Sequence, residues 1–298
     1  MTQQLIVGTH CHYLTGSTDG FHYKQEHLQF LRAGIITNYH PCRNMKLERM
    51  LFDGSLSHEQ CWGARMYDVI DFQALGCEAR EIVAPHPTKP INVGEHWFYL
   101  NVAGNILIKN CKANRIAGQF VQTVFDTRPN ETSDYDRFKD AGGTIHVWAC
   151  EGTDIGMCNP DHGPGGRASF PLSFFPSSQD VIVERTKIVN VGGDWWNNSK
   201  DPLKKKFKSF GGIMAHGHPN VTLEKNQIVL EDPDRDLVQI RNCENVVING
   251  GSYMAAGGNG AKFNIDGCKH ITISGVKSNA RLRINGKDVG LVSSGWKQ

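Results

Sequence analysis

Three short motifs in the middle of the chain carry the side chains best suited to acid–base chemistry. They are Gly152-Thr153-Asp154-Ile155-Gly156, Gly193-Asp194-Trp195-Trp196 and Ala215-His216-Gly217-His218. Hydrolysis of a glycosidic bond needs two carboxyl groups roughly 5–9.5 Å apart, one of them protonated. Asp154 and Asp194 could supply these two carboxyl groups, and His216 of the third motif is the remaining candidate catalytic residue. The competing interpretation is that the aspartates form turns by bonding to nearby backbone.

Histidines and cysteines raise the question of a metal site. Ligand types occur at His10, His12, Cys158, Asp161, His162, His216 and His218. The sequence contains neither a Cys-x₂-Cys pair nor a His-Glu-x-x-His helix, which would indicate zinc. It also has no cluster of acidic residues that would suit calcium. The sequence therefore predicts no metal and no cofactor, while metal binding by His10 and His12 or by residues 150–168 stays open.

The elements that must position these side chains follow a repeat of 25 residues. Asn220, Asn245 and His270 each precede an alternation of apolar and polar residues, and looser copies start at Asp71, Asn105 and Asp180. A fixed period of this length indicates a solenoid, and alternation of period two indicates strands. The pattern predicts an all-β fold, a coil of parallel strands with long loop insertions at about 126–143, 150–168 and 190–210. Residues 1–44 lack it and are expected to form a cap or an irregular first coil, with the β-helix over 45–298.

Aligning the strands on this repeat predicts an outward column of side chains, Arg65, Tyr99, Met214, Gln239 and Asn264, with Gln122 as a further member. A second column, two residues on, holds Tyr67, Asn101, His216, Arg241 and Asp266. Stacked coils are about 4.8 Å apart, so the columns would form a polar and aromatic trough suited to a sugar chain. The alternative is an ordinary solvated sheet face.

The insertion before Asn220 contains Trp195 and Trp196 and the basic run 204–208. Adjacent tryptophans in a polar loop serve either as a sugar-stacking platform or as anchors in a subunit interface. The candidate substrate-binding residues, from the strands and from this insertion, are Arg65, His96, Tyr99, Gln122, Trp195, Trp196 and Arg241.

Composition narrows the classes of protein. The net charge of +2 is too small to indicate binding to nucleic acid by overall charge. The sequence contains no run of about 18 apolar residues, so it does not predict a segment that spans a membrane. The N-terminal residues lack the features of a secretory signal peptide. The chain has nine cysteines, an odd number, and several occupy equivalent repeat positions. We expect synthesis in a reducing cytoplasm and buried, stacked thiols with raised pKa and low reactivity.

The repeat resembles the right-handed parallel β-helix proteins of the pectate-lyase-like superfamily over roughly residues 45–290. The residues that carry the resemblance are the unit 242–248, its looser relative 110–116, and the strands 95–100 and 119–124. The resemblance implies a single-stranded right-handed parallel β-helix. It also implies polysaccharide lyases, glycoside hydrolases, epimerases, or phage tailspikes and other virion proteins. The three motifs are similar in order to those of polygalacturonase-type hydrolases, but Asp154 lacks the preceding Asn and Trp195 replaces a second Asp.

These observations lead to one functional hypothesis and two alternatives. The first is a virion-associated, tailspike-like β-helix that binds or cleaves cell-surface polysaccharide. The alternatives are a non-enzymatic virion structural protein, such as a head-decoration or tail component, and an intracellular β-helix carbohydrate lyase, hydrolase or epimerase. Polysaccharide or other virion subunits are the expected partners, and homo-oligomerisation stays open.

Overall fold

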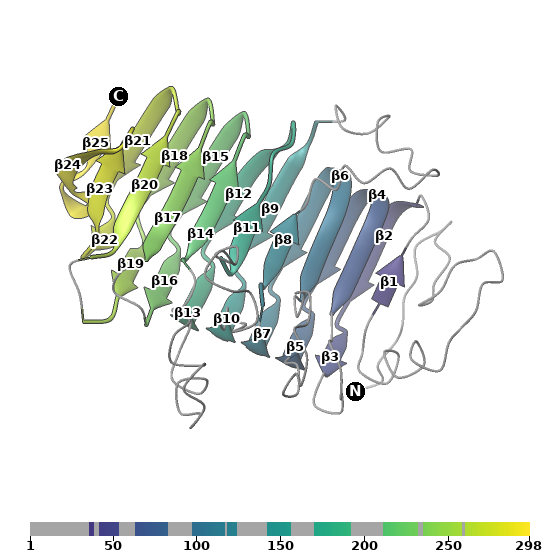
Figure 1. Ribbon diagram of the computed structural model, residues 1–298. Coiled ribbons are helices and arrows are strands. Elements are labelled where there is room, and N and C mark those ends of the chain that lie inside the picture. Colours follow the sequence, from purple (N-terminus) through teal and green to yellow (C-terminus); the bar gives the residue numbers. More distant parts are fainter. Residues whose placement is uncertain are drawn as a thin grey trace, which may run out of the picture.

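The computed structural model describes residues 36–38, 42–53, 63–82, 97–116, 118–123, 142–155, 170–191, 211–231, 235–257 and 260–298. Of the candidate site residues, Asp194, Trp195, Trp196 and His96 lie outside this part, as does the side chain of Arg65. Most of the expected cap and of the three expected insertions also lies outside it. The described residues form a parallel β-helix whose coils are stacked along one axis (Figure 1).

Each full coil contributes strands to three faces, here called A, B and C. Face A contains β1 (Ile36–Asn38), the first part of β4 (Ala64–Leu75), the first part of β6 (Phe98–Lys109), β8 (Val121–Thr123), β11 (Leu172–Phe174), β14 (Ile213–His216), β17 (Asp236–Arg241), β20 (Lys262–Asp266) and β23 (Arg281–Ile284). Face B contains β2 (Cys42–Glu48), the second parts of β4 and β6, β9 (Thr144–Trp148), β12 (Asp180–Glu184), β15 (Asn220–Glu224), β18 (Asn245–Asn249) and β21 (His270–Ser274).

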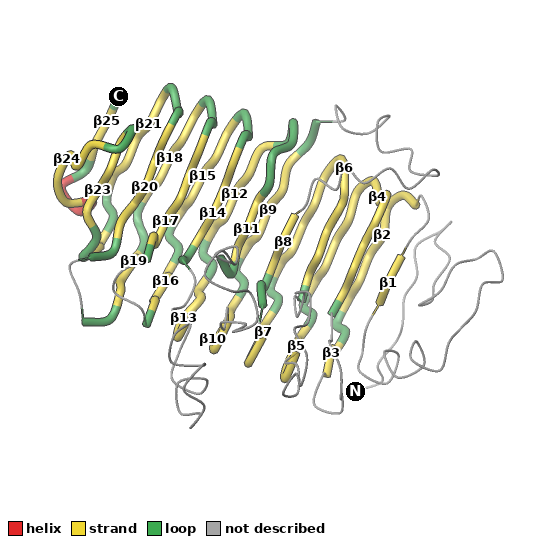
Figure 2. Tube along the Cα trace, in the orientation of Figure 1, coloured by secondary structure: helices red, strands yellow, loops and turns green. Residues whose placement is uncertain are grey.

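Face C contains β3 (Leu51–Asp53), β5 (Glu78–Ile82), β7 (Lys112–Ile116), β10 (Glu151–Ile155), β13 (Lys187–Val191), β16 (Gln227–Leu230), β19 (Ser252–Ala255) and β22 (Lys277–Ser278). The coils are numbered from 1 (β1, β2, β3) to 8 (β20, β21, β22), and β23 follows them. The C-terminal end closes with β24 (Lys287–Leu291), η2 (Val292–Ser294) and β25 (Trp296–Lys297), where β24 and β25 pair antiparallel with β23 and β21 (Figure 2).

Alternation along each strand explains the core. On face B the first inward residue of every strand is apolar, and adjacent coils place these residues directly above one another, as Val181, Val221 and Val246 show. In the N-terminal coils larger rings fill the bore, where Trp97 stacks on Phe98 at 4.5 Å and meets Phe120 edge-on at 4.9 Å. Burying each such side chain contributes about 1.5–3 kcal/mol, so stacking of coils is the main source of stability.

Two segments differ from the expected boundaries. The first coil begins by Ile36, inside the range 1–44 that was expected to form a cap or an irregular first coil. Residues 151–155, expected in a loop, form strand β10. Gly152 suggested a loop, but it lies within the strand in register with buried Ala113 of the preceding coil, where a Cβ would come within 2.8 Å of Ile188 Cδ1.

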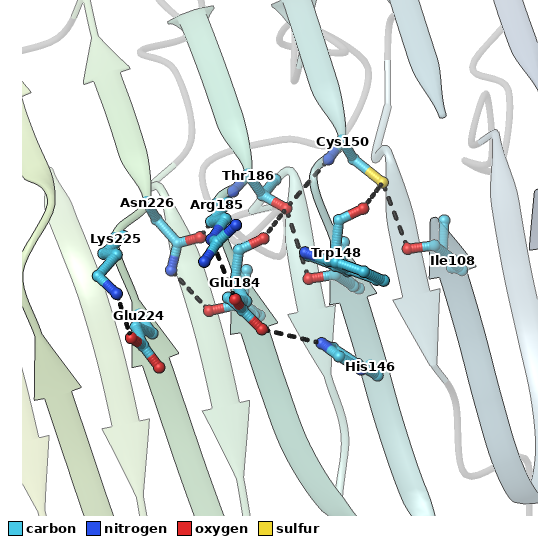
Figure 3. Close-up of polar contacts among 12 residues, drawn as sticks. Ile108, His146, Trp148, Cys150, Glu184, Arg185, Thr186, Glu224, Lys225 and Asn226 are labelled. Carbon is cyan, nitrogen blue, oxygen red and sulfur yellow. Dashed lines mark hydrogen bonds and ion pairs between the residues drawn. The ribbon is translucent and has the colours of Figure 1, made fainter. Parts of the chain in front are cut away.

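A column of buried side chains stands at the corner between faces B and C. Its members, here called the B–C ladder, are Cys77, Cys111, Cys150, Thr186 and Asn226. Each follows a residue with positive φ. The Thr186 N–H donates to Asn226 Oδ1 (2.9 Å), and Asn226 Nδ2 donates to the Val183 carbonyl (2.8 Å; Figure 3). Thus a side chain of one coil satisfies backbone groups that the tight corner of the previous coil leaves unpaired.

The cysteine positions are confirmed by the register. Cys77 and Cys111 share the ladder position, and Cys243 and Cys268 occupy equivalent positions of coils 7 and 8 at the corner between faces A and B. All four are buried. The expectation of raised pKa holds for Cys77, Cys111 and Cys268 but is wrong for Cys243. A hydrogen bond from the Cys268 thiol lowers the pKa of the Cys243 thiol to about 7.

Replacing Asn226 by Ala tests the B–C ladder. The substitution leaves the Thr186 N–H and the Val183 carbonyl without their partners in a buried corner. We expect the free energy of unfolding to fall by about 2–4 kcal/mol, measured by urea denaturation. Asn249→Ala is the matched control, because exposed Asn249 makes a side-chain bond only with Ser274 Oγ. Equal losses for the two variants would contradict the role of the ladder.

Candidate functional site

Face A carries the first predicted column, and the strand register confirms it. Consecutive coils pair Arg65 with Tyr99, Tyr99 with Gln122, Met214 with Gln239, and Gln239 with Asn264. Gln122 joins the column although its coil lacks the turn residue on which the others align. Ser173 stands between Gln122 and Met214, and Arg283 extends the column beyond Asn264. The column therefore runs from coil 2 to β23, with a buried member, Ser173, in coil 5.

The second predicted column is present in two parts. Tyr67 pairs with Asn101 near the N-terminal end, and His216, Arg241 and Asp266 pair in order near the C-terminal end. Together the two columns form one outward surface, here called the face A trough. Along the described part of the trough, mostly polar side chains follow one another at the spacing of the coils, about 4.8 Å.

Hydrogen bonds fix several side chains of the trough. Asp236 Oδ2 accepts from Gln239 Nε2 at 3.1 Å and from Asn264 Nδ2 at 3.4 Å. His216 Nε2 lies 3.0 Å from the Asn242 side-chain amide. Because their amides are held by bonds within the protein, Gln239 and Asn264 are positioned before any ligand arrives.

A cluster of buried polar side chains lies in the middle of the trough. Gln119 Nε2 donates to the Phe170 carbonyl at 3.0 Å and also to Ser173 Oγ. Ser173 Oγ donates to the same carbonyl at 3.0 Å. Both side chains are buried. These residues therefore join coils 4 and 5 and act as structural members of face A.

Arg241 is the exception among the charged residues of the trough. Its register neighbour in the next coil is Asp266, but Asp266 Oδ1 accepts from the Gly286 N–H at 3.0 Å. Within the described residues the exposed Arg241 guanidinium forms no side-chain hydrogen bond or ion pair. It therefore presents five N–H donors to whatever occupies the trough.

The candidate catalytic residues are not gathered by the described coils. Asp154 lies in β10 on face C of coil 4, whereas His216 ends β14 on face A of coil 6. Asp154 has positive φ, as does Asn190 in the next coil, and its Oδ1 accepts a hydrogen bond from Asn190 Nδ2. This contact between coils favours the structural interpretation of Asp154.

Face B carries a polar cluster that the sequence analysis did not identify (Figure 3). Lys109 Nζ lies 3.9 Å from the centre of the Trp148 ring, and His146 is nearly parallel to that ring. His146 Nε2 is 3.6 Å from Glu184 Oε2. Aligning the strands would have shown that Glu184 and Glu224 are register neighbours.

The two carboxylates of this cluster are held by their own cations. Arg185 lies 3.2 Å from Glu184, and Lys225 lies 2.8 Å from Glu224. The hydrogen bond and positive charge of Lys225 lower the pKa of Glu224. A general acid in glycoside hydrolysis needs a raised pKa, so this pair is poorly suited to that reaction.

His218 is a structural side chain. It is buried, and its Nδ1 lies 2.9 Å from the Gln179 carbonyl in coil 5. Burial lowers the pKa of its imidazole, which keeps the ring neutral. In the described parts of the chain, no three or more His, Cys, Asp and Glu side chains are grouped to hold a metal ion. No helix there is long and apolar enough to cross a bilayer.

A His218→Gln variant tests this assignment through pH. Because its pKa is lowered, His218 binds fewer protons in the folded state than in the unfolded state. The contribution of neutral His218 to the free energy of unfolding is therefore fully present above pH about 6.5 and is lost as the pH falls below that value. We expect the urea midpoint to fall less between pH 7 and pH 5 in the variant than in the wild type. His270→Gln, at an exposed position, should keep the wild-type pH dependence. An unchanged pH dependence in His218→Gln would refute the assignment.

Comparison with protein-family models, curated proteins and solved structures finds no match to this chain.

Proposed function

We propose that this protein is a carbohydrate-binding β-helix and that the face A trough holds an extended polysaccharide chain. The observation that carries the proposal is the in-register alignment of the amides Gln122, Gln239 and Asn264 along one face, with Tyr99 in the same column and Arg241 in the next. A polymer of repeating sugars presents hydroxyl groups at regular intervals. A surface whose donors and acceptors repeat along one axis can bind such a polymer at several points.

The chemistry of the trough supports a sugar ligand. Tyr99 offers an aromatic ring, half exposed, on which a sugar can pack. Gln122, Gln239 and Asn264 supply amides that both donate and accept hydrogen bonds. Arg241 supplies an uncompensated planar donor that makes charge-assisted hydrogen bonds.

The proposal is confined to binding. The described acidic residues of the trough, Asp236 and Asp266, already accept hydrogen bonds from protein groups. Asp154 lies on face C. Cleavage of a polysaccharide would therefore need Asp154 and Asp194, and not the acidic residues of the trough, as its two carboxyl groups. Unchanged turnover of a bacterial polysaccharide panel by an Asp154→Asn/Asp194→Asn variant would eliminate it.

We place this function in a virion, as in the tailspike-like β-helix proteins that the repeat resembles. A second candidate is a virion structural protein, favoured by the C-terminal end of the solenoid. There β24 exposes Val289 (43%) and Leu291 (51%), two residues apart on one strand, as a contact for another subunit. Size measurement separates the two, because a clean monomer without virion association argues against the structural role.

Binding to a glycan panel tests the trough directly. We expect Arg241→Ala to weaken binding of the recognised glycan about tenfold or more, because it removes a charge-assisted hydrogen bond of about 1.5–3 kcal/mol. Tyr99→Ala should weaken the same interaction through loss of ring packing.

The matched control is Arg185→Ala, which removes an exposed arginine at the corner between faces B and C. It should leave glycan affinity at the wild-type value. Binding of no glycan by the wild type, or equal losses for Arg185→Ala and Arg241→Ala, would contradict a site on face A.

A further inference from the structure

Two buried thiols lie side by side at the corner between faces A and B. Cys243 joins β17 to β18 in coil 7, and Cys268 joins β20 to β21 in coil 8. The Cys243 N–H donates to Cys268 Sγ at 3.5 Å. Register neighbours in adjacent parallel strands are about 4.8 Å apart, which is within the range of Cα separations of disulfides, about 4.4–6.8 Å. The backbone therefore already holds the two residues at bridging distance.

The surroundings of the pair favour its oxidation over that of the other stacked thiols. Cys268 is 7% exposed and Cys243 beneath it 1%, so peroxide reaches the pair from the side of Cys268, whereas Cys77, Cys111 and Cys150 of the B–C ladder are fully buried. The Cys268 thiol donates a hydrogen bond to Cys243, and this lowers the pKa of Cys243 to about 7. In the B–C ladder, hydrogen bonding between the thiols raises the pKa of Cys77 and of Cys111. The thiolate is the nucleophile, so the lowered pKa supports Cys243 as the residue of this adjacent pair that reacts first.

We propose that Cys243 and Cys268 form an oxidation site in which hydrogen peroxide converts the two thiols into a disulfide that links coils 7 and 8. The Cys243 thiolate attacks one peroxide oxygen, the O–O bond breaks, and the hydroxide that leaves takes up a proton to become water. Cys268 then attacks the sulfur of the sulfenic acid. The S–O bond breaks as the S–S bond forms, and the second hydroxide leaves as water with the Cys268 proton. Two electrons pass from the thiols to one peroxide, and a dithiol reductant reverses the reaction by exchange.

Oxidation at this site has a structural consequence. The bond closes a loop of 25 residues that spans one full turn of the solenoid. A cross-link of this kind restricts the unfolded chain and opposes separation of adjacent coils. The oxidised protein should therefore resist urea better than the reduced protein. This property is separate from glycan binding and does not depend on the proposed function.

The test is peroxide treatment of the native full-length protein, followed by alkylation and peptide mapping by mass spectrometry. We expect a Cys243–Cys268 cross-linked peptide about 2 Da lighter than its reduced components, and an increase in the urea midpoint that a dithiol reverses. In Cys268→Ser the link cannot form, but the serine hydroxyl can still donate a hydrogen bond to Cys243, and Cys243 should be trapped as a sulfenic acid by a 1,3-dicarbonyl probe. Cys111→Ala is the matched control, since it removes a buried stacked thiol and should leave the 243–268 link intact.

Two outcomes would overturn the proposal. One is that Cys243 and Cys268 both stay free in the native protein under peroxide that oxidises the urea-unfolded chain. The other is that a cross-link from Cys111 to Cys77 or Cys150 accumulates before the 243–268 link. The second outcome would place the reactive thiols in the B–C ladder.

Discussion

The structure depends on how the chain turns the corner between faces B and C in every coil. A residue with positive φ, such as Ala149, Arg185 or Lys225, makes the turn tight enough for one strand to follow another almost at once. The same geometry turns backbone N–H and carbonyl groups into the bore, where water does not reach them. The B–C ladder satisfies these groups with side chains of the next coil, as Asn226 does for coil 5. Each coil therefore needs its neighbour for hydrogen bonds as well as for apolar burial.

This interdependence determines what the sequence could reveal. The period of 25 residues and the alternation within each strand predict the coil, because both arise from contacts that repeat unchanged. The outward columns on face A follow from the same register, and even Gln122 was placed correctly. The strand that contains Gly152 and Asp154 was expected to be a loop, because glycine and aspartate are typical of loops. Here Gly152 lies inside a strand against the Ile188 side chain, and the Asp154 carboxylate contacts the next coil. Such roles depend on what lies in the neighbouring coil, which composition alone does not indicate.

The candidate site shows the same division. Positions that repeat, such as Tyr99, Gln122 and Arg241, could be aligned from the sequence. The face B cluster was missed because Glu184 and Glu224 are 40 residues apart, with an insertion between their strands. The order of the motifs along the chain suggested one site for Asp154 and His216, but that order does not determine the face of the coil on which a residue lies. In the described coils the two residues lie on different faces. A motif is brought to a site only if its position within the coil, and not just its coil number, agrees with the others.

Several charges on faces B and C are compensated by neighbouring side chains. On face C, Lys112 and Arg115 lie 3.7 and 3.4 Å from glutamates of adjacent coils. On face B, Glu184 and Glu224 each pair with the basic residue that follows in the chain. Exposed pairs of this kind contribute little stability, but they leave no charge for a ligand to neutralise. Arg241 on face A has no such partner among the described residues, because Asp266 is bound by the Gly286 N–H. The amides of Gln239 and Asn264 are already held in place, so this part of face A combines positioned amides with a guanidinium that a ligand can neutralise.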